Sequence, residues 1–214
     1  MNQTQIIQWM QKFADTIEKN KDYLTELDAA IGDADHGINM DRGFKKVMEK
    51  LPTLANQDIG NILKTVSMTL ISSIGGASGP LYGTFFLRGS TAVMGKQELT
   101  PEDTLKLLQA GLEGVIQRGK AQLGDKTMVD VLSPAVEAFE QAVDDEKTTE
   151  EAMENAIAAA EEGMKGTIPI IAKKGRASYL GERSMGHQDP GATSTYLMLR
   201  SLLESVREEV ISNK

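Results

Sequence analysis

The chain has 214 residues, no cysteine and a formal net charge of −8 at pH 7. Its length predicts one domain, residues 1–214, which is long enough to bury a substantial core without disulfides. The lack of cysteine excludes thiol catalysis and thiolate zinc sites, and the negative charge disfavours nucleic acid and membranes as partners. No stretch reaches the roughly 20 apolar residues of a membrane span, and the N-terminus lacks a signal-peptide pattern, so we expect a cytoplasmic protein.

Apolar residues recur at helical spacing along nearly the whole chain, and no segment alternates as a strand does. Ile6, Trp9 and Phe13 begin the first stripe, and Thr100-Pro101 marks a helix start because a capping residue precedes a first-turn proline. These signals predict an all-α protein, either an up-and-down bundle or a closed helical barrel. The expected helices span about residues 6–17, 23–31, 38–50, 59–74, 79–95, 100–118, 127–143, 149–172 and 191–211.

The first glycine-rich loop contains a cluster of carboxylates. Asp33 and Asp35 alternate on the turn after the helix that carries Asp28, so the three side chains can converge. Within about 5 Å they would repel by about 3 kcal/mol per pair at an effective dielectric of about 20. No Lys or Arg between residues 22 and 41 offsets this repulsion, whereas Mg²⁺, which prefers oxygen ligands, would.

Two alternatives compete with a magnesium site. A calcium EF-hand fails because its sixth position would be Ile38 instead of glycine, and its twelfth would be Phe44 instead of glutamate. A plain helix cap at Gly32 followed by Asx turns stays open for any single aspartate, but explains the cluster less well.

A second loop, from Gly75 to Pro80, separates two predicted helices and opens the second of them. Its glycines would let a phosphate approach the N–H groups at that helix start. A tight helix–helix turn would need the same residue type. Beside a metal site, we interpret the loop as a candidate diphosphate cradle.

Two further polar loops carry basic residues. The segment 119–127 resembles a Walker A loop, but it has one residue too many before the lysine and no preceding strand, so we reject that interpretation. Lys126 could still reach a phosphate, although a solvated side chain is the simpler expectation. The long segment 174–191 holds Arg176 and Arg183, whose guanidinium groups suit phosphate oxygens.

The two histidines, His36 and His187, both lie in polar, glycine-flanked loops. A buried structural role is therefore less expected for them than for most histidines.

Four long segments together carry a resemblance to a known family: IGDADHGINMDRGF, SSIGGASGPLYGTFF, GVIQRGKAQLGDKTM and KGRASYLGERSMGHQDPGATS. The chain resembles the nucleotide-binding L subunits of bacterial dihydroxyacetone kinases from about residue 5 to about residue 205. The resemblance implies an antiparallel, up-and-down eight-helix barrel with a nucleotide site at one rim.

The resemblance also implies the ligands and their contacts. Two Mg²⁺ ions would be held by Asp28, Asp33 and Asp35, beside bound ADP or ATP, with no covalent catalytic residue. Arg176 and Lys126 would bring the charge of the loaded site close to zero, as phosphoryl transfer requires. The implied nucleotide contacts are His36, Gly37, Ile38, Asn39, Ala77, Ser78, Gly119, Met128, Arg176, Asp189, Pro190 and Gly191.

Two subtypes of the family differ in their phosphate donor. In one, this module is fused behind a substrate domain and ATP is consumed. In the other, the module is a free subunit whose bound ADP is recharged by a phosphohistidine protein of the phosphotransferase system. Because the chain holds little beyond the module, we expect the free form, passing phosphate to dihydroxyacetone on a partner kinase subunit. The alternative is a nucleotide-dependent regulator that docks to a transcription factor.

Overall fold

The computed structural model describes residues 1–208, which form eight α-helices and two short 3-10 helices. Apart from one isolated bridge between Asn2 and Glu98, these residues contain no strand. The prediction of an all-α protein is therefore confirmed. The elements are α1 (Gln3–Ile31), α2 (His36–Lys50), η1 (Leu51–Thr53), α3 (Ile59–Ser73), α4 (Ser78–Ala92), α5 (Pro101–Gly119), α6 (Val129–Asp144), α7 (Thr149–Gly166), η2 (Arg176–Ser184) and α8 (Pro190–Arg207).

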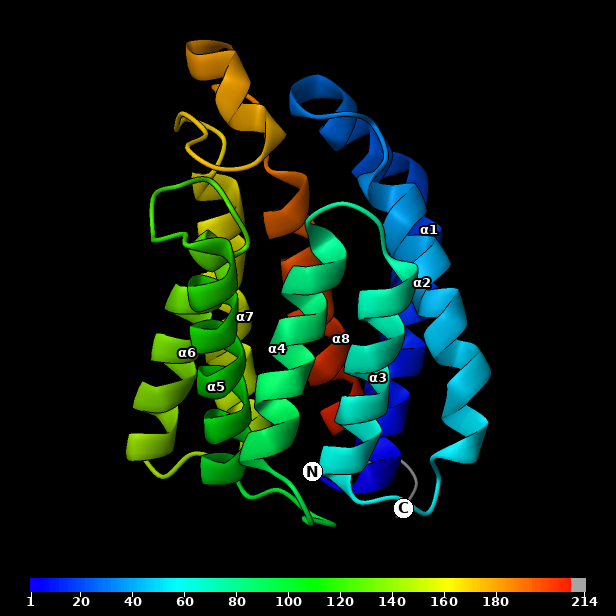
Figure 1. Ribbon diagram of the computed structural model, residues 1–214. Coiled ribbons are helices and arrows are strands. Elements are labelled where there is room, and N and C mark those ends of the chain that lie inside the picture. The colour runs from blue at the N-terminus through cyan, green and yellow to red at the C-terminus, as the bar shows by residue number, and fades with distance from the viewer. Residues whose placement is uncertain (209–214) are drawn as a thin grey trace.

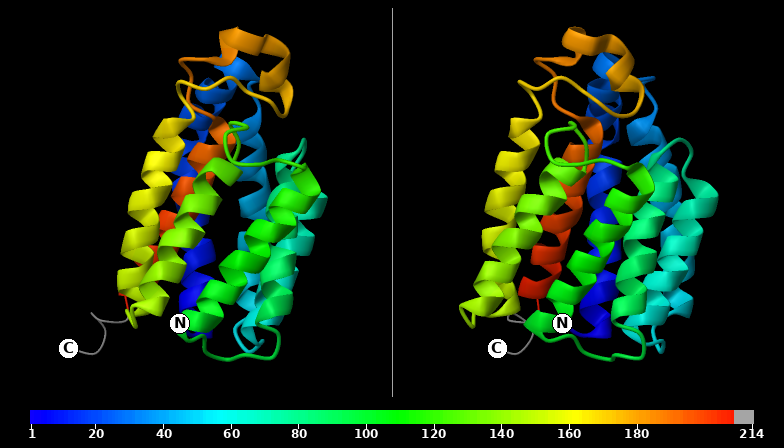
Figure 2. Two further views of the ribbon diagram at one scale, coloured as in Figure 1. Left: turned by 90° about the vertical axis from the view of Figure 1, so that its left-hand side faces the viewer. Right: turned by 60° about the vertical axis from the view of Figure 1, so that its left-hand side comes forward.

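The α-helices pack in a closed circuit. Each packs against the next along the chain, and α8 packs back against α1 (Figures 1 and 2). Short connections make neighbours antiparallel, as expected for an up-and-down arrangement. This circuit is compatible with the predicted eight-helix barrel.

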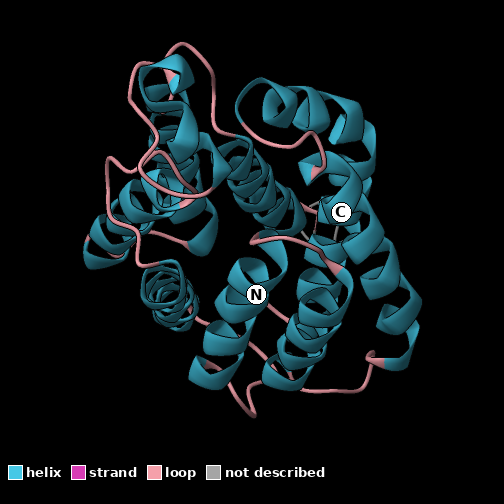
Figure 3. Ribbon diagram, turned by 45° about the horizontal axis from the view of Figure 1, so that its top comes forward, coloured by secondary structure: helices cyan, strands magenta, loops and turns pink. Residues whose placement is uncertain are grey.

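The antiparallel order sorts the connections into two groups. The α1–α2, α3–α4, α5–α6 and α7–α8 connections all lie at one end, the upper end in Figure 1, which we call the rim. The other connections and the N-terminus lie at the opposite end, which we call the base. Figure 3 brings the rim forward and shows its loops above the helices. The four loops that the sequence singled out are these rim connections.

Aromatic side chains fasten the centre of the circuit. The Trp9 and Phe86 rings lie 5.5 Å apart, and the Phe13 and Phe44 rings 4.5 Å apart, all fully buried or nearly so. The Trp9 indole Nε1 donates to the Met198 carbonyl at 2.9 Å. These contacts join α1 to α2, α4 and α8, and burying each ring stabilises the fold by about 1.5–3 kcal/mol.

The structure corrects three predicted boundaries. The first two predicted helices are one helix of 29 residues, because the apolar stripe resumes at Leu24 after a polar turn that holds no proline or glycine. Helix α7 ends at Gly166 instead of about residue 172, since Pro169 lacks the N–H that would continue it. The segment expected to be a loop contains η2.

Helix α8 is described to Arg207, so its predicted end near residue 211 lies outside the described residues. Within residues 1–208, every helix is too short or too polar to span a bilayer.

Candidate functional site

Two adjoining cavities open at the rim, with volumes of about 470 and 310 Å³. Ligand pockets commonly fall in this size range. The smaller cavity lies over the carboxylates at the end of α1, and the larger one extends between α4, α5 and α6. Both are lined by His36, Ala77, Ser78, Lys174, Gly175 and Asp189. One extended ligand could therefore occupy both.

The three aspartates predicted as metal ligands converge on the smaller cavity. Asp28, Asp33 and Asp35 each present a carboxylate oxygen, and these oxygens lie within 4.8 Å of one another. Asp28 Oδ2 also accepts from the backbone N–H groups of Asp35, at 2.8 Å, and His36, at 3.1 Å. An all-oxygen set at this spacing fits Mg²⁺.

Gly32 makes room for this arrangement at the end of α1. A Cβ on Gly32 would lie 2.0 Å from Asp28 Oδ1, so any larger residue would displace that carboxylate. Gly32 therefore both ends α1 and leaves room for the Asp28 carboxylate beside those of Asp33 and Asp35.

Arg176 supplies the positive charge that the neighbouring sequence lacks. Its Nε lies 2.9 Å from Asp33 Oδ2, and η2, which it begins, packs against α1. Arg176 was predicted to contact phosphate. In the structure it pairs with Asp33, one of the three carboxylates, at the wall of the smaller cavity.

His36 departs from the expectation that a histidine in a polar, glycine-flanked loop is less often buried. It is buried at the start of α2, with Nε2 2.9 Å from Ser194 Oγ and Nδ1 3.1 Å from Ser78 Oγ. The Tyr82 hydroxyl lies 2.7 Å from Ser194 Oγ and extends this chain of polar groups. Burial lowers the pKa of His36, against the opposing charges of Asp28 and Asp35, so the imidazole is neutral near pH 7.

Two helices that begin at the rim, α2 and α4, leave donors available to an anion. Their N-caps, Asp35 and Ala77, make no side-chain capping hydrogen bond, whereas at α6 the Val129 N–H donates to Thr127 Oγ1. Neither α2 nor α4 has an acidic residue in its first turn. Free N–H groups and the positive end of the helix dipole favour phosphate at such positions.

The larger cavity adds an apolar wall between α4 and α6, suited to a flat ring system. Its apolar lining comprises Pro80, Leu81, Val115, Ala121, Met128 and Val129.

Lys126 departs most from expectation. It is 1% exposed, and its ammonium donates to the carbonyls of Thr167 (2.7 Å), Ser184 (2.8 Å), His187 (2.5 Å) and Ile170 (3.2 Å). It is therefore neither a solvated lysine nor free to neutralise phosphate. Burial lowers its pKa, against the opposing effect of the Asp189 carboxylate.

Asp189 begins α8 and faces both cavities. Its Oδ2 accepts from the Ala192 N–H at 2.8 Å, which caps the helix. Burial raises the pKa of Asp189 to about 7, although this hydrogen bond and the charge of Lys126 oppose the rise. The carboxyl group is therefore poised between its two protonation states near neutral pH.

Most predicted nucleotide contacts reach a cavity wall. Gly37 and Ile38 do not: Gly37 packs so closely on α1 that a Cβ would lie 1.9 Å from the Lys21 carbonyl, and Ile38 is 50% exposed. The role of each in binding stays a prediction. Those that line one or both cavities are His36, Asn39, Ala77, Ser78, Gly119, Met128, Arg176, Asp189, Pro190 and Gly191.

Sequence reasoning missed several residues of the site. Lys174 lines both cavities and Arg118 the larger one, and neither makes an ion pair within residues 1–208. Asp130 is buried and accepts from the N–H groups of Gly124, at 2.6 Å, and Thr127, at 2.7 Å. The spacing of Thr127 and Asp130 matches a capping box and could have revealed this loop brace.

Sequence comparison identifies close relatives of the chain. The DAK2 domain model matches residues 30–204. The ADP-binding subunit DhaL of PEP-dependent dihydroxyacetone kinase from Escherichia coli (strain K12) is 51% identical over 208 residues, covering 97% of this chain and 99% of the relative. The ADP-binding subunit DhaL of PTS-dependent dihydroxyacetone kinase from Lactococcus lactis subsp. lactis (strain IL1403) is 44% identical, covering 94% and 96%.

Structural comparison gives the same fold. The crystal structure of the dihydroxyacetone kinase of C. freundii matches with a TM-score of 0.73 at 23% identity, over 94% of this chain and 34% of that chain. Its complex with AMP-PNP and Mg²⁺ matches with a TM-score of 0.70. The domain match and the near-full-length relatives together show that the chain belongs to the DAK2 family, in the group of kinase subunits named DhaL.

Proposed function

We propose that this chain is the ADP-binding subunit of a dihydroxyacetone kinase. Its bound nucleotide would receive a phosphoryl group from a phosphohistidine protein and pass it to dihydroxyacetone on a partner subunit, in the cytoplasm. The observation that carries the proposal is the juxtaposition at the rim: three carboxylates within 4.8 Å of one another beside helix starts that lack side-chain caps. Cations and phosphates are the natural ligands of such a pair of surfaces.

The acidic side would hold the metal. Asp28, Asp33 and Asp35 supply the oxygens for two Mg²⁺ ions, and Gly32 leaves Asp28 free to take part. When bound, Mg²⁺ neutralises phosphate charge and orients the phosphoryl oxygens. Asp28 is already held in place by the N–H groups of Asp35 and His36, so this ligand is preorganised.

The phosphate side would use backbone donors and two cations. With about −3 from the aspartates, about −3 from ADP and about +4 from two Mg²⁺ ions, the site retains about −2. Arg176 and Lys174, which both line the smaller cavity, can balance this charge. Lys174 takes the place that the sequence alone gave to Lys126, whose ammonium is already bound by carbonyls.

The apolar wall of the larger cavity would hold the adenine. Leu81, Val115 and Met128 shield a flat ring from water, while Gly119 and Thr127 line the same space. The two cavities together thus match the two chemical halves of a nucleotide.

A partner would have to complete the reaction. Nucleotide and metal would fill the two rim cavities, and phosphoryl transfer needs an acceptor held in line. Several apolar side chains around the rim are exposed and could meet such a partner: Ile38 (50%), Leu123 (64%), Tyr179 (88%) and Met185 (45%).

Reconstitution tests the proposal. The purified chain should bind ADP–Mg²⁺ but form no dihydroxyacetone phosphate from ATP alone. Activity should appear when the substrate-binding subunit and a phosphohistidine donor are added, and catalytic amounts of ADP should suffice. An Asp33→Asn variant is the matched negative control. Robust product formation by the isolated chain with ATP would contradict the proposal.

A further inference from the structure

Residues 167–189, which we call the cover loop, fold back on themselves above the cavities. The Gly186 N–H donates to the Ile168 carbonyl at 2.7 Å, and the Asp189 N–H to Thr167 Oγ1 at 3.1 Å. These bonds bring the two ends of the loop together. Figure 2 shows this segment lying across the rim.

Lys126 belongs to the α5–α6 connection, and its side chain extends into the cover loop. Its ammonium has three protons and faces four carbonyl oxygens, from Thr167, Ile170, Ser184 and His187. Two of these carbonyls, from Thr167 and Ile170, lie near the start of the cover loop, and the other two lie near its end. The ammonium therefore holds the two ends of the loop together. Removing the ammonium would take this donor from the buried carbonyls of Thr167 and Ser184, which is costly for a buried acceptor.

The same contact joins the two halves of the candidate site. The cover loop carries Lys174, Arg176 and Asp189 on the cavity walls, whereas the loop that holds Lys126 continues into Met128 on the apolar wall. The Asp125 carbonyl also accepts from the Lys173 N–H at 3.1 Å, which ties the two loops at a second point. Lys173 thus faces the neighbouring loop, and Lys174 faces the cavities.

We propose that Lys126 is a positioning residue for nucleotide binding: its ammonium fixes the cover loop so that Lys174 and Arg176 stand over the cavities. The proposal rests on the proposed function, because the ligand is taken to be ADP–Mg²⁺. Lys126 itself does not contact the nucleotide phosphates, since its donors are used by carbonyls. Its effect on binding is therefore indirect.

Matched methionine variants give the first test. Lys126→Met keeps the length of the side chain but removes the charge, and Lys120→Met makes the same change at an exposed position of the same connection. Lys126→Met should weaken ADP–Mg²⁺ binding at least about tenfold in calorimetry, about 1.4 kcal/mol, with Lys120→Met unchanged. Equal affinities of the two variants would overturn the proposal.

Amide exchange tests the anchor without nucleotide. In unliganded Lys126→Met, the N–H groups of Ala172, Lys173 and Gly186 should exchange faster than in the parent chain, while core amides of α1 keep their protection. Unchanged protection in the cover loop would overturn the anchoring role. If the parent chain itself does not bind ADP–Mg²⁺, the proposed function is wrong. The amide-exchange result then tests the anchoring role of Lys126 by itself.

Chemical rescue separates positioning from general damage. Lys126→Ala removes the atoms of n-propylammonium, so this amine should restore both ADP–Mg²⁺ affinity and cover-loop protection, whereas neutral 1-propanol should not. The four carbonyls lie at or beyond the end of α7, so both Lys126 variants should keep the parent circular dichroism spectrum. Loss of that spectrum in both variants would make Lys126 a residue of the fold and overturn the proposal.

A double-mutant cycle shows through which residue Lys126 acts. If Lys126 works by presenting Arg176, then Lys126→Met should weaken binding less in an Arg176→Ala background than in the parent chain. Full additivity would show that the cover loop does not transmit the effect through Arg176.

Discussion

The base and the rim of the helical circuit differ in how the first N–H groups of their helices are capped. At the base, α1, α3, α5 and α7 all begin at a residue whose side chain accepts from the first turn: Asn2, Asp58, Thr100 and Thr148. At the rim, within the described residues, Asp189 caps α8 and Thr127 Oγ1 accepts from the first turn of α6, whereas the N-caps of α2 and α4 make no such bond. Side-chain caps satisfy backbone donors within the protein, so the base is built to hold itself together.

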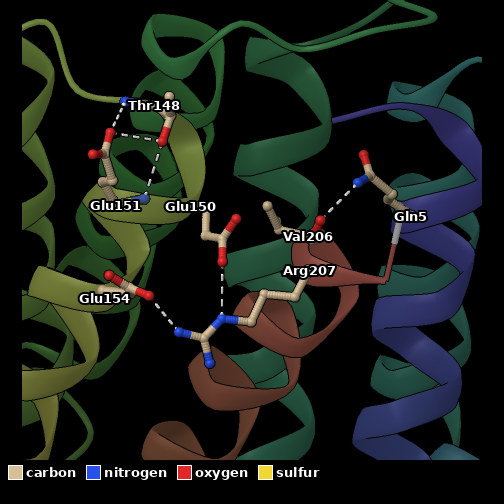
Figure 4. A network of polar contacts seen from close by, with 7 residues as sticks. All are labelled: Gln5, Thr148, Glu150, Glu151, Glu154, Val206 and Arg207. Atoms are coloured by element: carbon tan, nitrogen blue, oxygen red, sulfur yellow. Dashed lines mark hydrogen bonds and ion pairs between the residues drawn. The ribbon is translucent and has the colours of Figure 1, made fainter. Parts of the chain in front are cut away.

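Figure 4 shows a network of hydrogen bonds and ion pairs at the base. The Thr148 N–H and hydroxyl both donate to Glu151 at 2.9 Å, and the Glu151 N–H donates back to Thr148 Oγ1. Arg207, near the end of α8, pairs with Glu150 and Glu154 of α7. The rim instead keeps helix N–H groups and carboxylates that a ligand would satisfy. The lesson is that a missing cap can mark a binding surface.

The largest expected effect concerns the metal ligands. Asp33→Asn or Asp35→Asn should weaken Mg²⁺-dependent ADP binding at least about a hundredfold, about 2.7 kcal/mol, because a carboxylate oxygen is lost. The unfolding midpoint should change little, because the substitution relieves repulsion in the cluster, and the exposed ion pair with Arg176 that Asp33→Asn weakens contributes little. Calorimetric titration and thermal unfolding check both parts. Unchanged ADP affinity in both variants would remove the metal assignment.

Arg176 should come next in size. Arg176→Lys should weaken ADP–Mg²⁺ binding about tenfold although the charge is kept, because lysine lacks the planar fork of donors that suits phosphate and carboxylate oxygens. Titration of both forms with ADP and Mg²⁺ measures the change. If Arg176→Lys kept the ADP–Mg²⁺ affinity and the phosphoryl-transfer rate of the parent chain, Arg176 would contribute only its positive charge.

Substitutions at two glycines, both at the rim ends of their helices, separate an effect on the carboxylate cluster from an effect on helix stability. Gly32→Ala should weaken Mg²⁺-dependent binding several-fold, because its Cβ would lie 2.0 Å from Asp28 Oδ1. Gly166→Ala, at the end of α7, meets no atom within 4 Å and should raise helix stability by up to about 1 kcal/mol. Equal metal affinities of the two variants would show that Asp28 is not a ligand.

At the base, removing a cap should alter stability and nothing else. Thr148→Ala should cost about 1 kcal/mol and lower the unfolding midpoint by roughly 2–4 °C for a chain of this size. ADP–Mg²⁺ affinity should match that of the parent chain. If Thr148→Ala weakened nucleotide binding as much as Gly32→Ala does, the two ends would not be independent.

The smallest effect is the pH dependence of Asp189. Because burial raises the pKa of Asp189 from 3.8 to about 7, the folded chain keeps a proton that the unfolded chain releases. The stability from this proton is full below about pH 3.8 and is lost as pH rises through about 7. Asn can still cap α8, so the stability of the parent chain relative to Asp189→Asn should fall as the pH rises from 3.8 to about 7 and level off above that, measured with a chelator.

The pKa of Asp189 also depends on three neighbouring charged groups. The charge of Lys126 lowers the pKa of Asp189, whereas Asp130 and Asp28 raise it. Asp189→Asn leaves these three residues in place, but it also removes the carboxylate that opposes the lowered pKa of Lys126. A pH profile parallel to that of the parent chain would mean that Asp189 is ionised throughout.

Local patterns were enough to predict most of the fold. Each helix buries one stripe, so the spacing of residues such as Ile6, Trp9 and Phe13 could be read directly. The errors fell where local signals conflicted with packing. A polar turn interrupts the stripe of α1 without breaking the helix, and α7 ends at Gly166, shortly before Pro169, although the alanine-rich stretch before it favours helix.

The site was less predictable, because its geometry depends on contacts between distant loops. Composition identified the rim loops, but only the fold shows that Arg176 meets Asp33 and that Lys126 is enclosed by the cover loop. A lysine in a polar loop looks solvated until another loop closes over it. For the same reason, sequence reasoning could not distinguish Lys174, which faces the cavities, from its neighbour Lys173.

The most direct test of the contrast between the two ends is the metal dependence of nucleotide binding. ADP would be titrated calorimetrically into the chain with Mg²⁺ and, in parallel, with a chelator in place of Mg²⁺. We predict one ADP bound per chain with Mg²⁺ and affinity reduced at least about a hundredfold without it, since the rim carboxylates then repel the phosphates. Equal affinity under both conditions, or no binding with Mg²⁺, would contradict the assignment of the rim as a magnesium–nucleotide site.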